Sequence, residues 1–135
     1  MTHLLDTNVC VEHLRSRERS PFLKRFRLMP ADAIAVCSVV RAELLAGAYH
    51  SKSRKDELPR VIELLALFRS LPFDDPAAEQ YGRIRAHIES LGTPIGSNDL
   101  MIASIALANG LTLVTHNSSE FSRVPDLKLE DWHIS

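Results

Sequence analysis

Four acidic residues recur at comparable places along this sequence, each at or just beyond the carboxyl side of a stretch predicted to form a strand. They are Asp6, Glu43, Asp99 and Glu120. The carboxyl ends of parallel strands lie on one edge of a sheet, where ligands gather. Carboxylates brought together there repel one another, and at least one must hold a proton unless a cation neutralises the group. The pattern therefore predicts a site for a hard divalent cation.

The expected cation is Mg²⁺, for which Mn²⁺ can substitute. Carboxylate oxygens and water suit these ions, whereas softer metals call for Cys or clustered His, which the sequence does not supply at ligand spacing. Magnesium is typically held by one or two carboxylates together with waters and substrate phosphate. A bound ion lowers the pKa of a water and offsets charge on a phosphodiester. Hydrolysis of a phosphodiester through a metal-activated water is the predicted reaction.

Each acid also has a simpler structural explanation. Asp6, or Asn8 after it, can accept hydrogen bonds from the first N–H groups of the following helix. Glu43 lies inside a predicted helix, beside its apolar stripe, and can point to water. Asp99 lies in the first turn of its helix, where a negative charge is favoured by about 0.3 to 1 kcal/mol. Ser97 and Asn98 already offer capping groups, so the helix does not need Asp99 to compensate its dipole. The recurrence of acids therefore favours a shared site.

The elements that position these acids follow from the hydrophobic pattern. Continuous apolar runs predict buried parallel strands, and apolar residues at helical spacing predict helices. The predicted strands are residues 4–5, 33–37 and 111–115, with an edge strand at 71–73 and a last short strand at 127–129. The predicted helices are residues 9–14, 21–29, 39–50, 58–70, 76–88 and 100–108. The third and fourth form a hairpin, and the last is apolar on nearly every side, which predicts a buried central helix.

Capping residues and the C-terminal end add detail to this scheme. Ser20 followed by Pro21 is expected to start the second helix, and Ser38 is expected to cap the third. Trp132 is expected to anchor the C-terminal end in the core.

Composition limits the organisation of the chain. Its 135 residues, 45% of them hydrophobic, suffice for one α/β domain spanning residues 1–135. The net charge of -1 hides a basic segment between residues 15 and 27, which suits a polyanionic partner as well as a solvated helix face. The basic residues are Arg15, Arg17, Arg19, Lys24, Arg25 and Arg27.

The compartment is predicted from cysteine usage and hydropathy. Cys10 and Cys37 lie in apolar runs without the paired spacing of a zinc or redox site, so we expect them to be buried hydrophobes in a reducing environment. No secretory pattern opens the chain, and no apolar run reaches the roughly 18 residues that span a bilayer. A cytoplasmic protein without membrane contact is therefore expected.

Four short motifs resemble, in their order and spacing, the successive signatures of PIN-domain nucleases. They are LLDTN at 4–8, RAEL at 41–44 followed by Gly47, GSNDLMIA at 96–103, and LVTHN at 113–117 followed by Glu120 and Phe121. The likeness covers almost the whole chain, including the RVP of 123–125 and the EDW of 130–132. More narrowly, the chain resembles the VapC toxins of type II toxin-antitoxin modules. Each motif alone is short, but four in the right order are specific.

The resemblance implies a fold, an activity and partners. The implied fold is a three-layer α/β/α sandwich with a central parallel sheet. The implied activity is that of a Mg²⁺-dependent endoribonuclease acting on single-stranded parts of RNA, commonly a tRNA. It also implies a cognate VapB antitoxin, whose helix would lie in an apolar groove beside the first helices and direct a basic residue towards the acids, and a homodimer.

Site residues carry over from the family by position. Asp6, Glu43 and Asp99 match its core acids, with Asp6 and Asp99 as the direct metal ligands. Many PIN domains place Asp where this chain has Asn117, so Glu120 is expected to supply the missing charge. Two further positions, Thr7 and Thr115, are expected to orient carboxylates or a water.

Several other functions fit parts of the pattern. A haloacid-dehalogenase-type phosphatase needs a second Asp at the position of Asn8, and a receiver-like domain needs a Lys at the end of the late strand. A catalytically inert PIN-like scaffold that binds RNA or protein would not need all three core acids. A PIN-type nuclease that cuts DNA, or that processes RNA outside a toxin-antitoxin module, is the nearest alternative.

Overall fold

A five-stranded parallel sheet forms the centre of the protein in the computed structural model, which describes residues 1–133. The strand order is β3-β2-β1-β4-β5, and all four neighbouring pairs are parallel. The strands are β1 (His3–Leu5), β2 (Ile34–Cys37), β3 (Arg69–Leu71), β4 (Thr112–Val114) and β5 (Leu129–Glu130). The predicted parallel sheet and α/β class are confirmed.

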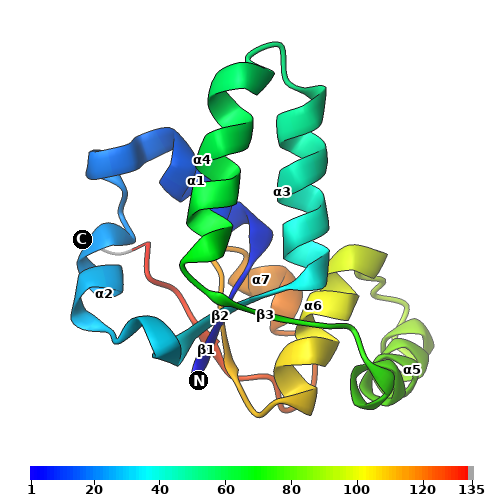
Figure 1. The fold of residues 1–135 in the computed structure, drawn as a ribbon. Helices are drawn as coiled ribbons and strands as arrows, with labels where there is room; N and C mark the ends of the chain where they lie inside the picture. Colours follow the sequence, from blue (N-terminus) through cyan, green and yellow to red (C-terminus); the bar gives the residue numbers. More distant parts are fainter. Residues whose placement is uncertain (134–135) are drawn as a thin grey trace.

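Helices cover both faces of this sheet, with α2 on one side and α5 and α6 on the other (Figure 1). The α-helices are α1 (Thr7–Ser16), α2 (Leu23–Leu28), α3 (Ser38–His50), α4 (Arg54–Ala66), α5 (Asp75–Ser90), α6 (Ser97–Ala108) and α7 (Ser118–Phe121). Two 3-10 turns, η1 (Arg17–Arg19) and η2 (Ala31–Ala33), complete the connections. The three layers agree with the predicted sandwich.

The register places the ends of three central strands side by side. Leu4 of β1 pairs with Ala35 of β2 and with Leu113 of β4, and all three are fully buried. The N–H of Asp6 continues the ladder by donating to the carbonyl of Val114 at 3.0 Å. Because the strands are parallel, the residues that follow β1, β2 and β4 emerge at one edge.

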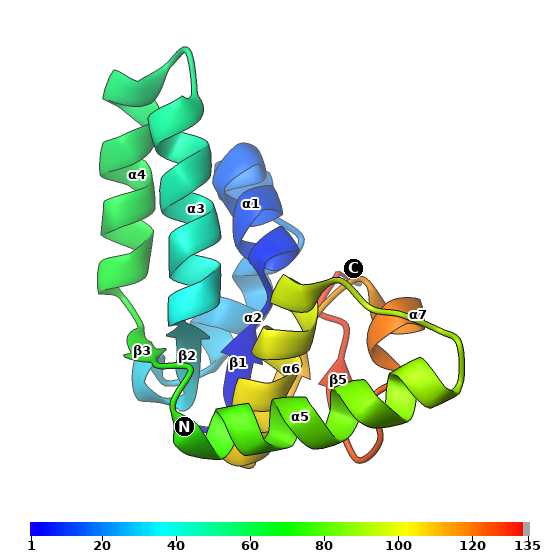
Figure 2. The ribbon, with the colours of Figure 1, turned by 90° about the vertical axis from the view of Figure 1, so that its right-hand side faces the viewer.

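Two helical features determine the shape around that edge. The predicted hairpin is confirmed: α3 and α4 run antiparallel and project well beyond the sheet, with α1 beside α3 (Figures 1 and 2). The prediction of a central helix is also confirmed, because α6 buries residues on every side, including Leu100, Ile102 and Ile105.

Trp132 is 2% exposed and anchors the C-terminal segment as expected.

Several local predictions were wrong. Ser38 is the first residue of α3 and does not cap it, because the capping position is occupied by Cys37. The helix after Ser20 starts only at Leu23, and the Ser20 hydroxyl instead accepts from the N–H of Phe22 at 3.2 Å. Gly96 occupies the capping position of α6, so the two polar residues before Asp99 are not its caps.

Strand and helix boundaries also differ from the predictions. The edge strand β3 ends at Leu71, before Pro72, since proline cannot donate to a strand ladder. The single-turn helix α7 was not predicted. No helix among residues 1–133 combines the length and the apolar character needed to cross a membrane.

Candidate active site

Asp6 is the fixed point of the site. It directly follows β1 and is only 1% exposed. Its Oδ1 accepts from the N–H of Thr7 at 2.7 Å, and its Oδ2 accepts from the hydroxyl of Thr115 at 2.8 Å. The capping role is therefore real, since Asp6 is the N-cap of α1. Each carboxylate oxygen has a second lone pair, so both remain able to accept another ligand.

Glu43 reaches the same edge from α3. Its Oε1 accepts from the hydroxyl of Thr7 at 2.7 Å, and the side chain is half-buried. Thr7 thus connects two acids, because its N–H binds Asp6 while its hydroxyl binds Glu43. The alternative in which Glu43 simply points away into water does not hold, although one of its oxygens accepts no side-chain hydrogen bond from residues 1–133.

Glu120 and Asn117 form the far side of the site. The side-chain amide of Asn117 donates to Oε2 of Glu120 at 2.8 Å, and the N–H of Gly96 lies 3.4 Å from Oε1. The N–H of Asn117 in turn donates to the hydroxyl of Thr115 at 2.9 Å. Glu120 therefore joins the start of α6, which carries Asp99, to the loop after β4.

The four acids lie within one another's electrostatic field. Desolvation by burial is the largest cause that raises the pKa of Asp6, and the charges of Glu43 and Glu120 raise it further, against the opposing hydrogen bonds from its two threonine partners. Desolvation also raises the pKa of Asp99, to about 6, followed by the charges of the other three acids and a hydrogen bond with Glu120. The structure thus brings all four predicted acids to one place.

This donor set fits a divalent cation held mainly by water. Within the described part of the chain, no group of three or more His, Cys, Asp or Glu side chains is arranged to hold a metal ion. Mg²⁺ does not need such a cage, because it usually keeps several waters and takes one or two carboxylates. Burial first, and then the charges of the neighbouring acids, raise the pKa values of Asp6 and Asp99, and a bound cation would stabilise both carboxylates in their ionised form.

Two buried thiols lie close behind the acids. Burial, and then the charge of Asp6, raise the pKa of Cys10, while burial raises the pKa of Cys37 to about 11. Both side chains are at most 1% exposed. The expectation that they are small buried hydrophobes is confirmed.

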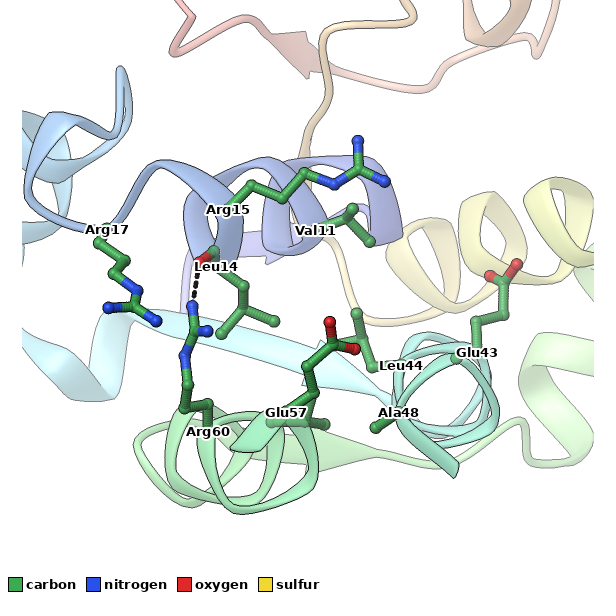
Figure 3. A pocket seen from close by; sticks show the side chains of 11 residues that line it. Val11, Leu14, Arg15, Arg17, Glu43, Leu44, Ala48, Glu57 and Arg60 are labelled. Carbon is green, nitrogen blue, oxygen red and sulfur yellow. Dashed lines mark hydrogen bonds between the residues drawn. The ribbon is translucent and has the colours of Figure 1, made fainter. Parts of the chain in front are cut away.

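A groove of about 550 Å³ opens beside the acids, between α1, α3 and α4 (Figure 3). Its lining comprises Val11, Leu14, Arg15, Arg17, Glu43, Leu44, Gly47, Ala48, Glu57, Arg60 and Val61. Glu43 therefore belongs both to the groove and to the acidic site. The groove is the apolar depression beside the first helices that the family resemblance led us to expect.

Comparison with known proteins decides the family. Residues 3–127 match the PIN domain family. The chain belongs to the PIN-domain family. The prediction from the four motifs is thereby confirmed, and nucleases of this family are generally dependent on a divalent metal ion.

Individual relatives resemble this PIN domain over nearly its whole length. Ribonuclease VapC2 of Rickettsia felis is 37% identical over 132 residues, which cover 98% of each chain. The tRNA(fMet)-specific endonuclease VapC of Salmonella typhimurium is 35% identical over 129 residues, which cover 96% of each chain.

Solved structures give the same picture. The crystal structure of VapBC2 from Rickettsia felis, bound to a DNA fragment from its promoter, matches with a TM-score of 0.90 and 36% identity, covering 98% of this PIN domain and 99% of that chain. The DNA-bound VapBC of Salmonella typhimurium matches with a TM-score of 0.92 and 34% identity, covering 98% of each chain.

Sequence reasoning missed parts of the site that depend on tertiary structure. The N–H of Gly96 was not expected to contact Glu120, and Arg60 was not expected beside α1. Gly96 opens one of the four motifs, but a glycine has no side chain that could signal a contact with Glu120, and Arg60 lies outside all four motifs. Both contacts join residues far apart in the sequence, so they depend on the tertiary structure: Gly96 with Glu120, and Arg60 with Leu14.

Proposed function

We propose that this PIN domain is the toxin of a type II toxin-antitoxin module and that it is a Mg²⁺-dependent endoribonuclease. Relatives that cover nearly the whole chain are ribonucleases by name, one of them specific for tRNA(fMet). A tRNA is therefore the substrate class that we propose. The observation on which the chemistry depends is the buried carboxylate of Asp6. Its pKa is raised, and Glu43, Asp99 and Glu120 are its acidic neighbours.

In this proposal Asp6 and Asp99 hold the cation, and Mn²⁺ can replace Mg²⁺. When bound, a divalent ion supplies Lewis-acid polarisation of the phosphate and lowers the pKa of a water. The protein contributes fixed geometry, because both oxygens of Asp6 are held by hydrogen bonds and cannot turn freely. Preorganised groups of this kind need no rearrangement during the reaction.

The other residues have positioning and proton-handling roles. Thr7 orients Glu43 through a 2.7 Å hydrogen bond, leaving the second carboxylate oxygen able to accept a proton from the attacking water. Glu120 supplies the fourth negative charge, and Asn117 orients it. Thr115 fixes the positions of Asp6 and Asn117 relative to each other, because its hydroxyl donates to the Asp6 carboxylate and accepts from the N–H of Asn117.

The proposed partners are an RNA substrate and a VapB-type antitoxin in the cytoplasm. The similar solved structures are VapBC complexes, which supports the antitoxin. We expect its helix to lie on the apolar floor formed by Leu14, Leu44 and Val61, close to Glu43. We also expect a homodimer, which gel filtration of the purified chain would test.

The central experiment is cleavage by the purified chain. Labelled tRNA and matched single strands of RNA and DNA are incubated with Mg²⁺, with Mn²⁺ or with EDTA. We expect cleavage of RNA in either metal and none in EDTA. Loss of RNA cleavage by orders of magnitude is expected for Asp6→Asn and for Asp99→Asn, with the circular dichroism spectrum retained.

A matched control is Asp56→Asn, which removes an exposed acid in the first turn of α4. Its activity is expected to equal that of the wild type. Undiminished activity of either acid variant would refute the ligand assignment. Cleavage of the DNA strand alone would instead support the alternative of a DNA nuclease.

A further inference from the structure

The groove beside the acids carries an excess of positive charge on the walls above its apolar floor. Arg15 and Arg17 come from the end of α1 and from η1, and Arg60 comes from α4. Figure 3 shows Arg17 and Arg60 together at one end of the groove and Glu43 at the other, with Arg15 extended along α1 between them. We call Arg15, Arg17 and Arg60 the arginine wall.

No carboxylate lies within ion-pair distance of the arginine wall in the described part of the chain. Arg25 and Arg85, by contrast, have glutamate partners at 3.6 and 2.7 Å. Among residues 1–133, Arg60 donates only to the carbonyl of Leu14, so most of its five N–H groups have no partner there. The arginine wall is therefore available to an anionic ligand.

The backbone of Arg17 provides a second observation. Its φ is 51°, a left-handed value that side-chain-bearing residues adopt at a cost in free energy. Strained conformations cluster at functional sites, where the surrounding structure maintains them. Here the strained residue ends α1 and belongs to the groove.

We infer that the arginine wall binds the sugar-phosphate backbone of the RNA beside the bond that is cut, an inference that rests on the proposed ribonuclease function. Guanidinium groups bind phosphate oxygens with paired N–H donors. Phosphate contacts of this kind fix the register of a nucleic acid without reading its sequence. The strand would run from the acids at Glu43 along α1 towards Arg17.

The dimensions and charges of the groove agree with this path. From Thr7, beside Glu43, to Ser16 the helix rises by about 13 Å at about 1.5 Å per residue. Charges along one stacked nucleic-acid strand are spaced by about 3.4 Å, so this length covers several phosphates. Glu57, in the middle of the groove, opposes the arginines and is expected to weaken binding of RNA.

The inference also gives the antitoxin a simple way to inhibit. A helix on the apolar floor would occupy the space that the RNA backbone needs. Binding of RNA and binding of antitoxin would then exclude each other even where they use different side chains.

The test measures how RNA binding depends on salt, because each phosphate contact contributes about 0.7 to the slope of log affinity against log salt for a single strand. Affinity for a fluorescently labelled single-stranded RNA is measured in EDTA, where no cleavage is expected. The variant Arg15→Gln with Arg17→Gln is expected to lower this slope by about 1.4. Between 50 and 200 mM salt, the wild type would then lose about sevenfold more affinity than the variant.

A double variant of equal charge change is the control. Lys52→Gln with Arg54→Gln removes two exposed cations at the tip of the α3–α4 hairpin and is expected to leave the slope unchanged. The variant Glu57→Gln is expected to tighten RNA binding. In Mg²⁺, the arginine variant is expected to raise KM for the same RNA and to change kcat little.

The outcomes separate this inference from the proposed function. If the wild type cleaves RNA and the arginine and control variants have the same slope, the arginine wall does not bind RNA and the inference fails alone. Unchanged RNA binding with weakened binding of the purified antitoxin would likewise overturn it, by assigning the arginines to that protein. If the wild type neither binds nor cleaves RNA, both the proposed function and this inference fail.

Discussion

Replacing Asp99 by Asn is expected to stabilise the metal-free protein while abolishing its activity. The pKa of Asp99 is raised from 3.8 to about 6, mainly by desolvation and then by the charges of the neighbouring acids. The folded state therefore binds this proton more tightly than the unfolded state does. Above pH 6 the ionised carboxylate is a destabilising group, which an uncharged amide of the same shape removes.

The magnitude follows from the size of the shift. A rise of about two pKa units, at about 1.36 kcal/mol per unit, sets a ceiling of about 3 kcal/mol. Asp99 is only half-buried, so solvent screening reduces the expected gain to about 1 to 2 kcal/mol. For a chain of this size that corresponds to a rise in Tm of about 3 to 8 °C.

The assay is thermal unfolding of wild type and Asp99→Asn in EDTA at several pH values. The raised pKa makes the wild type lose stability as pH rises from about 4 to about 6, because over that range the folded state still binds a proton at Asp99 that the unfolded state has released. The difference in Tm between the two proteins is therefore expected to be near zero at pH 4 and to reach its full value of about 3 to 8 °C at pH 7. Mg²⁺ is expected to raise the Tm of the wild type more than that of the variant.

One result would refute this reasoning directly. If Asp99→Asn is no more stable than the wild type at pH 7 in EDTA, burial and the neighbouring acids do not raise the pKa of Asp99 as the structure implies. A difference that stays constant between pH 4 and pH 7 would equally exclude titration of Asp99 as its cause.

Further predictions concern the support of the site and the core. Thr115→Val deprives the buried Oδ2 of Asp6 of its 2.8 Å partner, so a loss of about 1 to 3 kcal/mol in urea unfolding and slower RNA cleavage are expected. Ile102→Ala, at a fully buried position of α6, is expected to cost about 2 to 5 kcal/mol, whereas Ile62→Ala, at a position 52% exposed, is expected to change stability by less than about 0.5 kcal/mol. Trp132→Ala is expected to cost about 3 to 5 kcal/mol in the same assay, because it removes the buried C-terminal anchor.

The sheet and the positions of the acids were predictable because they depend on local patterns. An unbroken apolar run such as Ile34–Cys37 has few stable places other than the interior of a parallel sheet. Asp6 interrupts such a run, which marks both the end of the strand and the edge where ligands gather. The uniformly apolar composition of α6 likewise predicted a helix buried on all sides.

Capping and the groove were not predictable in the same way. Cys37 and Gly96 take the capping positions of α3 and α6 although serines follow them directly, because the path of the preceding strand or loop decides where each helix begins. Arg60 contacts Leu14, which lies 46 positions earlier in the sequence. That contact exists because α1 and α4 both pack against α3, which brings Arg60 within reach of the end of α1.

The two buried cysteines make the interior of the site observable without any added label. Thiolate is the reactive form, and burial suppresses it at both Cys10 and Cys37. An alkylating reagent can therefore reach these sulfur atoms only in molecules in which α1, for Cys10, or the end of β2, for Cys37, has transiently opened. The rate of alkylation then measures how often this region opens, and mass spectrometry can follow it in the presence of cation, RNA or antitoxin to reveal which of them holds the region closed.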